Sequence, residues 1–134
     1  MMTESLHQDA VQQAREILLS HPTVDAAYLL GSAAEDRLRP DSDVDIAILI
    51  RRSSAFSVED RLALMATLGR IFGRSIDLGL LDTSNLVYAK EAISRGRLIA
   101  ERDHTVTATF AMYALSMYAT LQEARREVLR AYAA

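Results

Sequence analysis

Apolar residues recur along this chain with two different spacings, and together they outline the elements of a fold. Near the N-terminus, helical spacing predicts an amphipathic helix from about Leu6 to Ser20, just before Pro22. Dense apolar runs, rich in branched and aromatic residues, predict four strands at 24–30, 44–50, 75–81 and 97–100. The second run is almost unbroken, which is typical of a strand covered on both faces.

Cap and turn residues predict helices between the strands. Ser32 with Glu35 three residues later is a capping-box pattern that predicts a short helix from Ser32, and the Pro-Asp-Ser segment at 40–42 predicts a turn. Further helices are predicted from a Ser57–Asp60 start to a stop at Gly73, from a cap at 82–85 to Arg95, and from about Thr105 to the end. This order predicts an α/β (α+β) fold in one domain over 1–134, with a small mixed sheet of about four strands flanked by helices.

The last predicted helix is long for a chain of this size. We expect one apolar stripe of it to pack on the sheet or on the first helix; the stripe contains Val106, Phe110, Tyr113, Met117, Leu121, Ala124 and Val128. Met112, Leu115 and Tyr118 remain outside this contact and are candidates for a partner surface, because Met and Tyr are favoured at interfaces. The alternative is that the whole apolar arc belongs to the core. The segment 122–127 predicts a solvated face with weak ion pairs.

Composition narrows the classes of function. Half of the 134 residues are hydrophobic and a quarter are charged, as in a globular protein, and a net charge of −3 offers no basic patch for long nucleic acid. The absence of cysteine excludes disulfides and thiolate zinc sites and fits a reducing cytoplasm. No apolar run approaches the length of a membrane span, and the N-terminus lacks the pattern of a secretion signal. We therefore expect a cytoplasmic protein with no membrane partner.

Three carboxylates are candidates for chemistry. Asp43 and Asp45 open the second predicted strand and project to the same side, because alternate strand residues share a face. Asp77 stands between apolar neighbours in the third predicted strand, so the three converge if these strands are adjacent. Buried like charges repel each other unless a cation neutralises them. Oxygen-only ligands suit Mg²⁺ or Mn²⁺, and two such ions can assist an in-line phosphoryl displacement. Asp77 is a candidate for accepting the proton of the attacking hydroxyl, or for holding the metal that acidifies it.

Gly31 and Ser32 lie at the predicted turn between the first strand and the short helix. Gly31 permits a tight turn and a close backbone approach, and the helix-start N–H groups with the Ser32 hydroxyl can receive phosphate oxygens. Each feature also has an ordinary interpretation: Asp-x-Asp occurs at solvated strand ends, and Ser32 can be a helix cap. The order of the features along the chain favours the functional interpretation. An EF-hand calcium loop is excluded, because Ile46 stands where glycine is required and Arg52 where the bidentate Glu belongs.

On these residues the chain resembles the nucleotidyltransferase superfamily that includes DNA polymerase beta. The motif is Gly31-Ser32, a ten-residue spacer, Asp43-Val44-Asp45, and a third acid at Asp77. More narrowly, the chain is similar to the minimal nucleotidyltransferases (MNT) that act as antitoxins beside HEPN ribonuclease toxins. The resemblance covers nearly the whole chain. It departs from many relatives after Ala34, where they carry a basic residue and a glycine; here two acidic residues follow.

The resemblance implies a nucleotidyltransferase fold and a set of roles. Members bind a nucleoside triphosphate, ATP in this case, with Mg²⁺ and transfer the nucleoside monophosphate to a hydroxyl. Gly31 and Ser32 would contact phosphates, and Asp43, Asp45 and Asp77 would be the catalytic, metal-binding acids. The implied acceptor is a tyrosine of a cognate HEPN toxin. The alternatives are a small-molecule acceptor of the aminoglycoside type, or a non-catalytic antitoxin that masks its toxin by contact.

Overall fold

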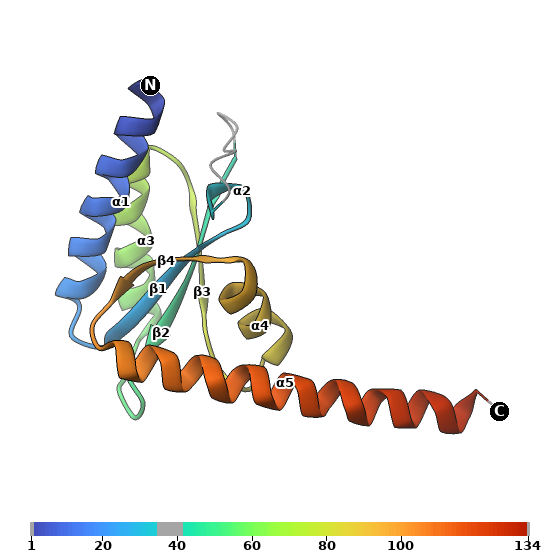
Figure 1. Ribbon diagram of the computed structural model, residues 1–134. Helices are drawn as coiled ribbons and strands as arrows, with labels where there is room; N and C mark the ends of the chain where they lie inside the picture. Colours follow the sequence, from blue (N-terminus) through green and yellow to red (C-terminus); the bar gives the residue numbers. More distant parts are fainter. Residues whose placement is uncertain (1, 35–41, 134) are drawn as a thin grey trace.

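The structure is a computed structural model that describes residues 2–34 and 42–133. Its centre is a four-stranded sheet, which contains β1 (Val24–Leu30), β2 (Val44–Ile50), β3 (Ile76–Leu80) and β4 (Arg97–Glu101) in the order β3-β2-β1-β4. β1 runs antiparallel to both of its neighbours, whereas β2 and β3 are parallel (Figure 1). The predicted mixed sheet is therefore confirmed, and the two acid-bearing strands are adjacent, which was the condition for their carboxylates to converge.

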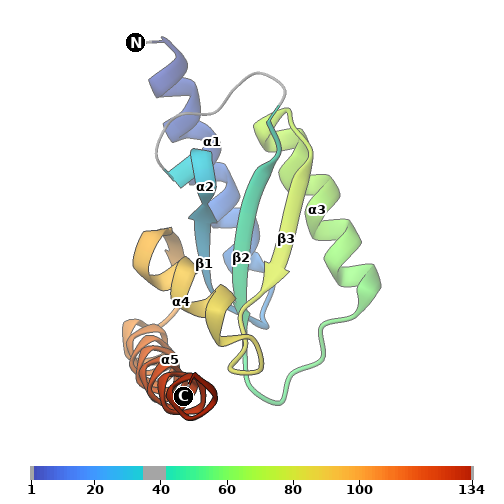
Figure 2. The ribbon, with the colours of Figure 1, turned by 90° about the vertical axis from the view of Figure 1, so that its right-hand side faces the viewer.

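Helices cover both faces of the sheet. α1 (Met2–Ser20) and α3 (Val58–Phe72) lie on one side, and α4 (Leu86–Arg95) and the start of α5 (His104–Tyr132) lie on the other (Figures 1 and 2). α2 (Gly31–Ala34) is a single turn at the end of β1. No helix among the described residues combines the length and apolarity that a bilayer span requires.

Two apolar layers hold this arrangement together. Ile46 and Ile48 of β2 are buried in the layer toward α1 and α3, whereas Ala47 and Leu49 are buried in the layer toward α4 and α5. The unbroken apolar run of β2 follows from this double coverage. The second layer is rich in small side chains, which let α4 and α5 approach closely: Ala26, Ala47, Ala89, Ala92 and Ala114.

The predicted limits of α3 and α4 are confirmed, whereas α1 begins at Met2 rather than at about Leu6 and α2 begins at Gly31 rather than at Ser32. At the start of α3, the Asp60 N–H donates to the Ser57 hydroxyl over 3.0 Å, and the Ser57 N–H donates to an Asp60 carboxylate oxygen over 3.0 Å. Gly73 ends this helix with a left-handed φ of 65°. Glu35, the partner in the proposed Ser32 capping box, and residues 40 and 41 of the predicted turn lie outside the described residues.

α5 contradicts part of the prediction. In the stripe from Val106 to Val128, Phe110 packs against the second apolar layer, whereas most of the other residues are exposed. The helix contacts α4 and β1 mainly through an adjoining flank, on which Thr107 and Ala114 are buried. Tyr118, expected outside the contact, is half-buried and lies under Lys90, whose Nζ is 5.5 Å from the ring centroid. The reason is that α5 crosses the ends of the strands and continues beyond the body of the protein (Figure 1). Residues in the first part of α5, among them Phe110 and Ala114, reach the close-packed alanine layer.

Candidate active site

The structure places two of the predicted acids next to each other. Asp45 is the second residue of β2 and Asp77 the second residue of β3, and the parallel register pairs them directly. Their side chains share the face of the sheet that α4 covers, because their strand neighbours alternate into the opposite layer. Asp45 is half-buried and Asp77 is exposed on the edge strand. The pair therefore presents two carboxylates at the rim of the sheet, one of them open to solvent.

Gly31 lies against the same carboxylate pair. Leu30 pairs with Asp45 across β1 and β2, so the chain turns into α2 directly beside Asp45. Gly31 has a φ of +60°, and a Cβ built on it would lie 3.4 Å from Asp45 Oδ2. The predicted turn at Gly31 is thus observed, and its positive φ is one that the absence of a side chain allows. Ser32 belongs to α2, but its side chain lies outside the described structure.

The acids act on each other electrostatically. Burial raises the pKa of the Asp45 carboxyl, and the nearby charges of Asp77 and then Asp43 raise that pKa further. Asp43 is exposed and precedes β2, so it contributes charge to the cluster from outside the sheet. The charges of Asp77 and Asp43 thus oppose the ionisation of Asp45, and a region of negative potential of this kind favours a cation.

The donor set fits Mg²⁺ or Mn²⁺, although it is not a complete cage. Among the described residues, no group of three or more His, Asp or Glu side chains is arranged to hold a metal ion by itself. Mg²⁺ commonly binds through one or two carboxylates, with water and substrate phosphates as its other ligands. The adjacent pair of Asp45 and Asp77, with oxygen donors only and a raised Asp45 pKa, matches that mode of binding.

Tyr88 is a component of the site that the sequence analysis did not identify. It lies in α4, and burial raises the pKa of its phenol first, followed by the charges of Asp77 and Asp45; the Arg61 guanidinium acts in the opposite direction. Its ring rests on Gly79, where an added Cβ would lie 2.7 Å from Tyr88 Cζ. The sequence contained an indirect signal. Gly79 follows Asp77 by two residues and shares its face of β3, and a glycine inside a strand often marks the close approach of another group.

Two arginines approach the acids from neighbouring segments. Arg61 of α3 donates a hydrogen bond to the Leu78 carbonyl of the edge strand. Arg74 donates to the Ser42 carbonyl over 3.2 Å, directly before Asp43. Arg61 and Arg74 thus bind backbone carbonyls of the segments that carry Asp77 and Asp43.

Comparison with known families agrees with this geometry. The sequence profile of the Polymerase beta, Nucleotidyltransferase family matches residues 12–105, which include Gly31 and all three acids. The chain belongs to this nucleotidyltransferase family, as the sequence motif predicted. No match was found among curated protein sequences.

Solved structures with the same fold include several toxin–antitoxin complexes. A chain from a toxin–antitoxin structure with AMP-PNP has a TM-score of 0.74 at 23% identity, covering 92% of this chain and 98% of that one. A chain from the MntA–HepT complex has a TM-score of 0.70 at 23% identity, covering 95% and 99%. A chain from the tri-AMPylated Shewanella oneidensis HEPN toxin in complex with MNT antitoxin has a TM-score of 0.71 at 22% identity, covering 96% and 99%. The predicted likeness to MNT antitoxins is confirmed at the level of the fold.

Proposed function

We propose that this chain is a Mg²⁺- or Mn²⁺-dependent nucleotidyltransferase that transfers AMP from ATP to a tyrosine hydroxyl of a cognate HEPN toxin, and that it acts as the antitoxin. The observation that carries the proposal is the in-register pair of Asp45 and Asp77 beside Gly31. Family membership supports nucleotidyl transfer as the reaction. Structural relatives with AMP-PNP and with an AMPylated toxin support ATP as the donor and a protein as the acceptor.

Some residues of the site would bind the nucleotide and the metal ion, and one would accept a proton. Gly31 leaves room for phosphate oxygens against the backbone, and Ser32 with the N–H groups of α2 would donate hydrogen bonds to them. Asp43, Asp45 and Asp77 would hold the Mg²⁺, which when bound offsets phosphate charge and makes the α-phosphorus more electrophilic. Asp77, exposed on the edge strand, would accept the proton of the incoming hydroxyl.

The reaction balances without a further reagent. The acceptor oxygen forms a bond to the α-phosphorus of ATP, the bond from that phosphorus to the bridging oxygen breaks, and pyrophosphate leaves. Because Asp43 and Asp77 are both exposed, the site is open to a hydroxyl on the surface of another macromolecule. This openness favours a protein acceptor over a small molecule, which would need enclosure to be held in place.

Mass spectrometry of the acceptor tests the proposal. The purified chain is incubated with ATP, Mg²⁺ and the protein encoded next to it, and we expect that protein to gain one or more AMP units. Label on the α-phosphate of ATP should be retained on the acceptor, and label on the γ-phosphate should be lost.

Asp45→Asn should abolish this transfer, and Asp9→Asn, an exposed acid on α1, should leave it unchanged. If Asp45→Asn still neutralises the toxin, masking by contact replaces catalysis as the mechanism. If the wild-type chain adds no AMP under any nucleotide or metal condition, the proposed reaction is wrong.

A further inference from the structure

The hydroxyl of Tyr88 occupies the place that a side chain at position 79 would fill. A Cβ built on Gly79 would lie 2.0 Å from Tyr88 Oη. Gly79 pairs with Ala47 in the sheet, in the row next to the paired acids, and this row shares the face that α4 covers. Tyr88 of α4 therefore adds a hydroxyl beside Asp77 at a point where β3 itself carries no side chain.

The Tyr88 hydroxyl makes no hydrogen bond within residues 2–34 and 42–133. Burial raises the pKa of this phenol, and the charges of Asp77 and Asp45 raise it further, as expected for a hydroxyl near both acids. A half-buried hydroxyl without a partner loses part of its hydration and gains nothing in return. Its donor is therefore available to a group that enters from outside the chain.

The space between the Tyr88 hydroxyl and Asp77 can accommodate one bridging oxygen atom. Positions 77 and 79 are two residues apart on one strand, so their side chains begin about 6.6 Å apart. Asp77 is exposed, so its carboxylate is free to turn into this space. An oxygen atom with a hydrogen bond of about 2.7 Å to each group would bridge about 5.4 Å. The two side chains can therefore hold an incoming hydroxyl between them.

The order of the strands separates the two ends of the proposed reaction. Gly31 lies beside Asp45 on the β1 side of the site. Tyr88 and Asp77 lie on the β3 side, with β2 between the two groups. In an in-line displacement, the attacking oxygen and the leaving group lie on opposite sides of the phosphorus. With the phosphates at Gly31, the attacking oxygen enters from β3, an edge strand that a large acceptor can approach.

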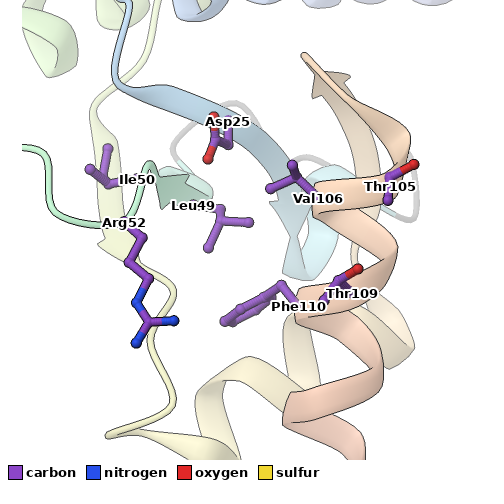
Figure 3. A pocket seen from close by; sticks show the side chains of 8 residues that line it. All are labelled: Asp25, Leu49, Ile50, Arg52, Thr105, Val106, Thr109 and Phe110. Carbon is purple, nitrogen blue, oxygen red and sulfur yellow. The ribbon is translucent and has the colours of Figure 1, made fainter.

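A cavity at the other end of β2 lies too far from the acids to hold the acceptor. It has a volume of about 310 Å³, and its apolar walls contain Leu49 and Ile50 of β2 and Val106 and Phe110 of α5 (Figure 3). Ile50 follows Asp45 by five residues on the strand, which corresponds to about 16 Å. A small acceptor in this cavity could not reach the acids, which leaves the position beside Tyr88 as the candidate.

We propose that Tyr88 positions the acceptor: its Oη donates a hydrogen bond to the attacking hydroxyl oxygen, while that hydroxyl donates its own hydrogen bond to Asp77. This assignment rests on the proposed nucleotidyl transfer. As the acceptor oxygen bonds to the α-phosphorus, its proton passes to Asp77 and pyrophosphate leaves with the electrons of the broken bond. Tyr88 keeps its proton, and its hydrogen bond stabilises the negative charge that develops on the attacking oxygen. Gly79 is required because a side chain there would displace the phenol.

Tyr88→Phe tests the hydroxyl separately from the ring. The free energy of unfolding should not fall, because the ring remains and the lost hydroxyl has no hydrogen bond in the described chain. With the protein encoded next to the chain as saturating acceptor, kcat of AMP transfer should fall on the order of 100-fold, with KM for ATP unchanged. Binding of Mn²⁺ together with AMP-PNP, measured by electron paramagnetic resonance of free Mn²⁺, should equal that of the wild-type chain.

Tyr118→Phe is the matched control. Tyr118 is also half-buried, but it lies on α5, and its hydroxyl accepts a hydrogen bond from Gln122 Nε2 over 2.5 Å. Removing this hydroxyl should leave kcat of AMP transfer unchanged, because it lies outside the proposed path of the acceptor.

Gly79→Ser tests where the hydroxyl must lie. In the Tyr88→Ala background the ring is gone, and a serine at 79 would place its hydroxyl near the point that Tyr88 Oη occupies. Gly79→Ser with Tyr88→Ala should therefore transfer AMP about 10-fold faster than Gly79→Ala with Tyr88→Ala, which carries the same Cβ without an oxygen. Equal rates for the two double variants would overturn the proposed position of the donor.

The outcomes distinguish this role of Tyr88 from the proposed function. If the wild-type chain and Tyr88→Phe transfer AMP equally fast, the role of Tyr88 is wrong and nucleotidyl transfer stands. Loss of Mn²⁺ and AMP-PNP binding in Tyr88→Phe would also overturn the role, because the hydroxyl would then belong to the metal–nucleotide site. A wild-type chain that transfers no AMP would overturn the proposed function and this assignment with it.

Discussion

The repulsion between Asp45 and Asp77 should be measurable as a gain in stability when either acid is neutralised. The two residues are direct partners in a parallel pair, and neighbouring strands lie about 5 Å apart. Two unit charges at about 5 Å repel by about 0.8 kcal/mol in water and by about 3 kcal/mol at an effective dielectric constant of about 20. Because Asp77 is exposed, we expect a value near the lower limit, about 1 kcal/mol at low salt.

A double-mutant cycle isolates the repulsion energy between Asp45 and Asp77. Asp45→Asn and Asp77→Asn are each expected to raise the free energy of unfolding in urea at pH 7.5 with EDTA present. The double variant should gain less than the sum of the two, by about the repulsion energy, and 1 M salt should reduce the coupling. Asp9→Asn on α1 is the control and should change stability little.

The pH dependence has a definite sign. Burial and the charges of Asp77 and Asp43 raise the pKa of folded Asp45, so the folded protein keeps this proton to a higher pH than the unfolded chain does. The contribution of Asp45 to stability is therefore greatest below the unfolded carboxyl pKa, about 3.9, and it is lost as pH rises through the folded pKa. Asp45→Asn should remove this decline. In the double-mutant cycle, a coupling energy of zero between Asp45 and Asp77, or a favourable one, would refute the proposed repulsion.

Three further substitutions test the packing and the turns. Gly79→Ala should destabilise the fold by about 1–3 kcal/mol because its Cβ meets the Tyr88 ring, and Tyr88→Ala in the same chain should recover part of that loss in urea denaturation. Ser57→Ala should cost about 1 kcal/mol through loss of the α3 cap, and an unchanged urea midpoint would contradict that role. Gly31→Ala and Gly73→Ala should each cost about 1–2 kcal/mol, because both residues have positive φ; only Gly31→Ala should also slow AMP transfer, since Gly73 has nothing within 4 Å of an added Cβ.

The fold was largely predictable because its signals are local. The apolar runs at 24–30 and 44–50 match β1 and β2 to the residue, and the capping box at Ser57 marked the start of α3. The face shared by Asp45 and Asp77 followed from strand alternation once β2 and β3 were assumed to be neighbours. Sequence spacing could not supply that adjacency, because pairing between strands separated by a helix depends on the whole topology.

The contact flank of α5 and the position of Tyr88 were not predicted, and the physical reason is the same for both. Periodicity reports which residues share a flank of a helix, but it does not report what that flank contacts. The stripe from Val106 to Val128 was therefore expected to pack on the sheet or on α1, whereas Phe110 of that stripe packs on the body together with Thr107 and Ala114 of the adjoining flank. Tyr88 was missed for a related reason, because its place over Gly79 depends on how α4 crosses β3. Long-range packing decides both cases.

Binding of Mn²⁺ in the presence of AMP-PNP is the most direct test of the central claim, and electron paramagnetic resonance of free Mn²⁺ measures it without requiring the acceptor. The account predicts that the wild-type chain with AMP-PNP removes Mn²⁺ from solution beyond what the nucleotide alone binds, and that Asp45→Asn and Asp77→Asn each abolish this excess while Asp9→Asn keeps it. No excess in the wild-type chain, or an equal excess in the Asp45→Asn and Asp77→Asn variants, would contradict the assignment of these carboxylates as the metal–nucleotide site.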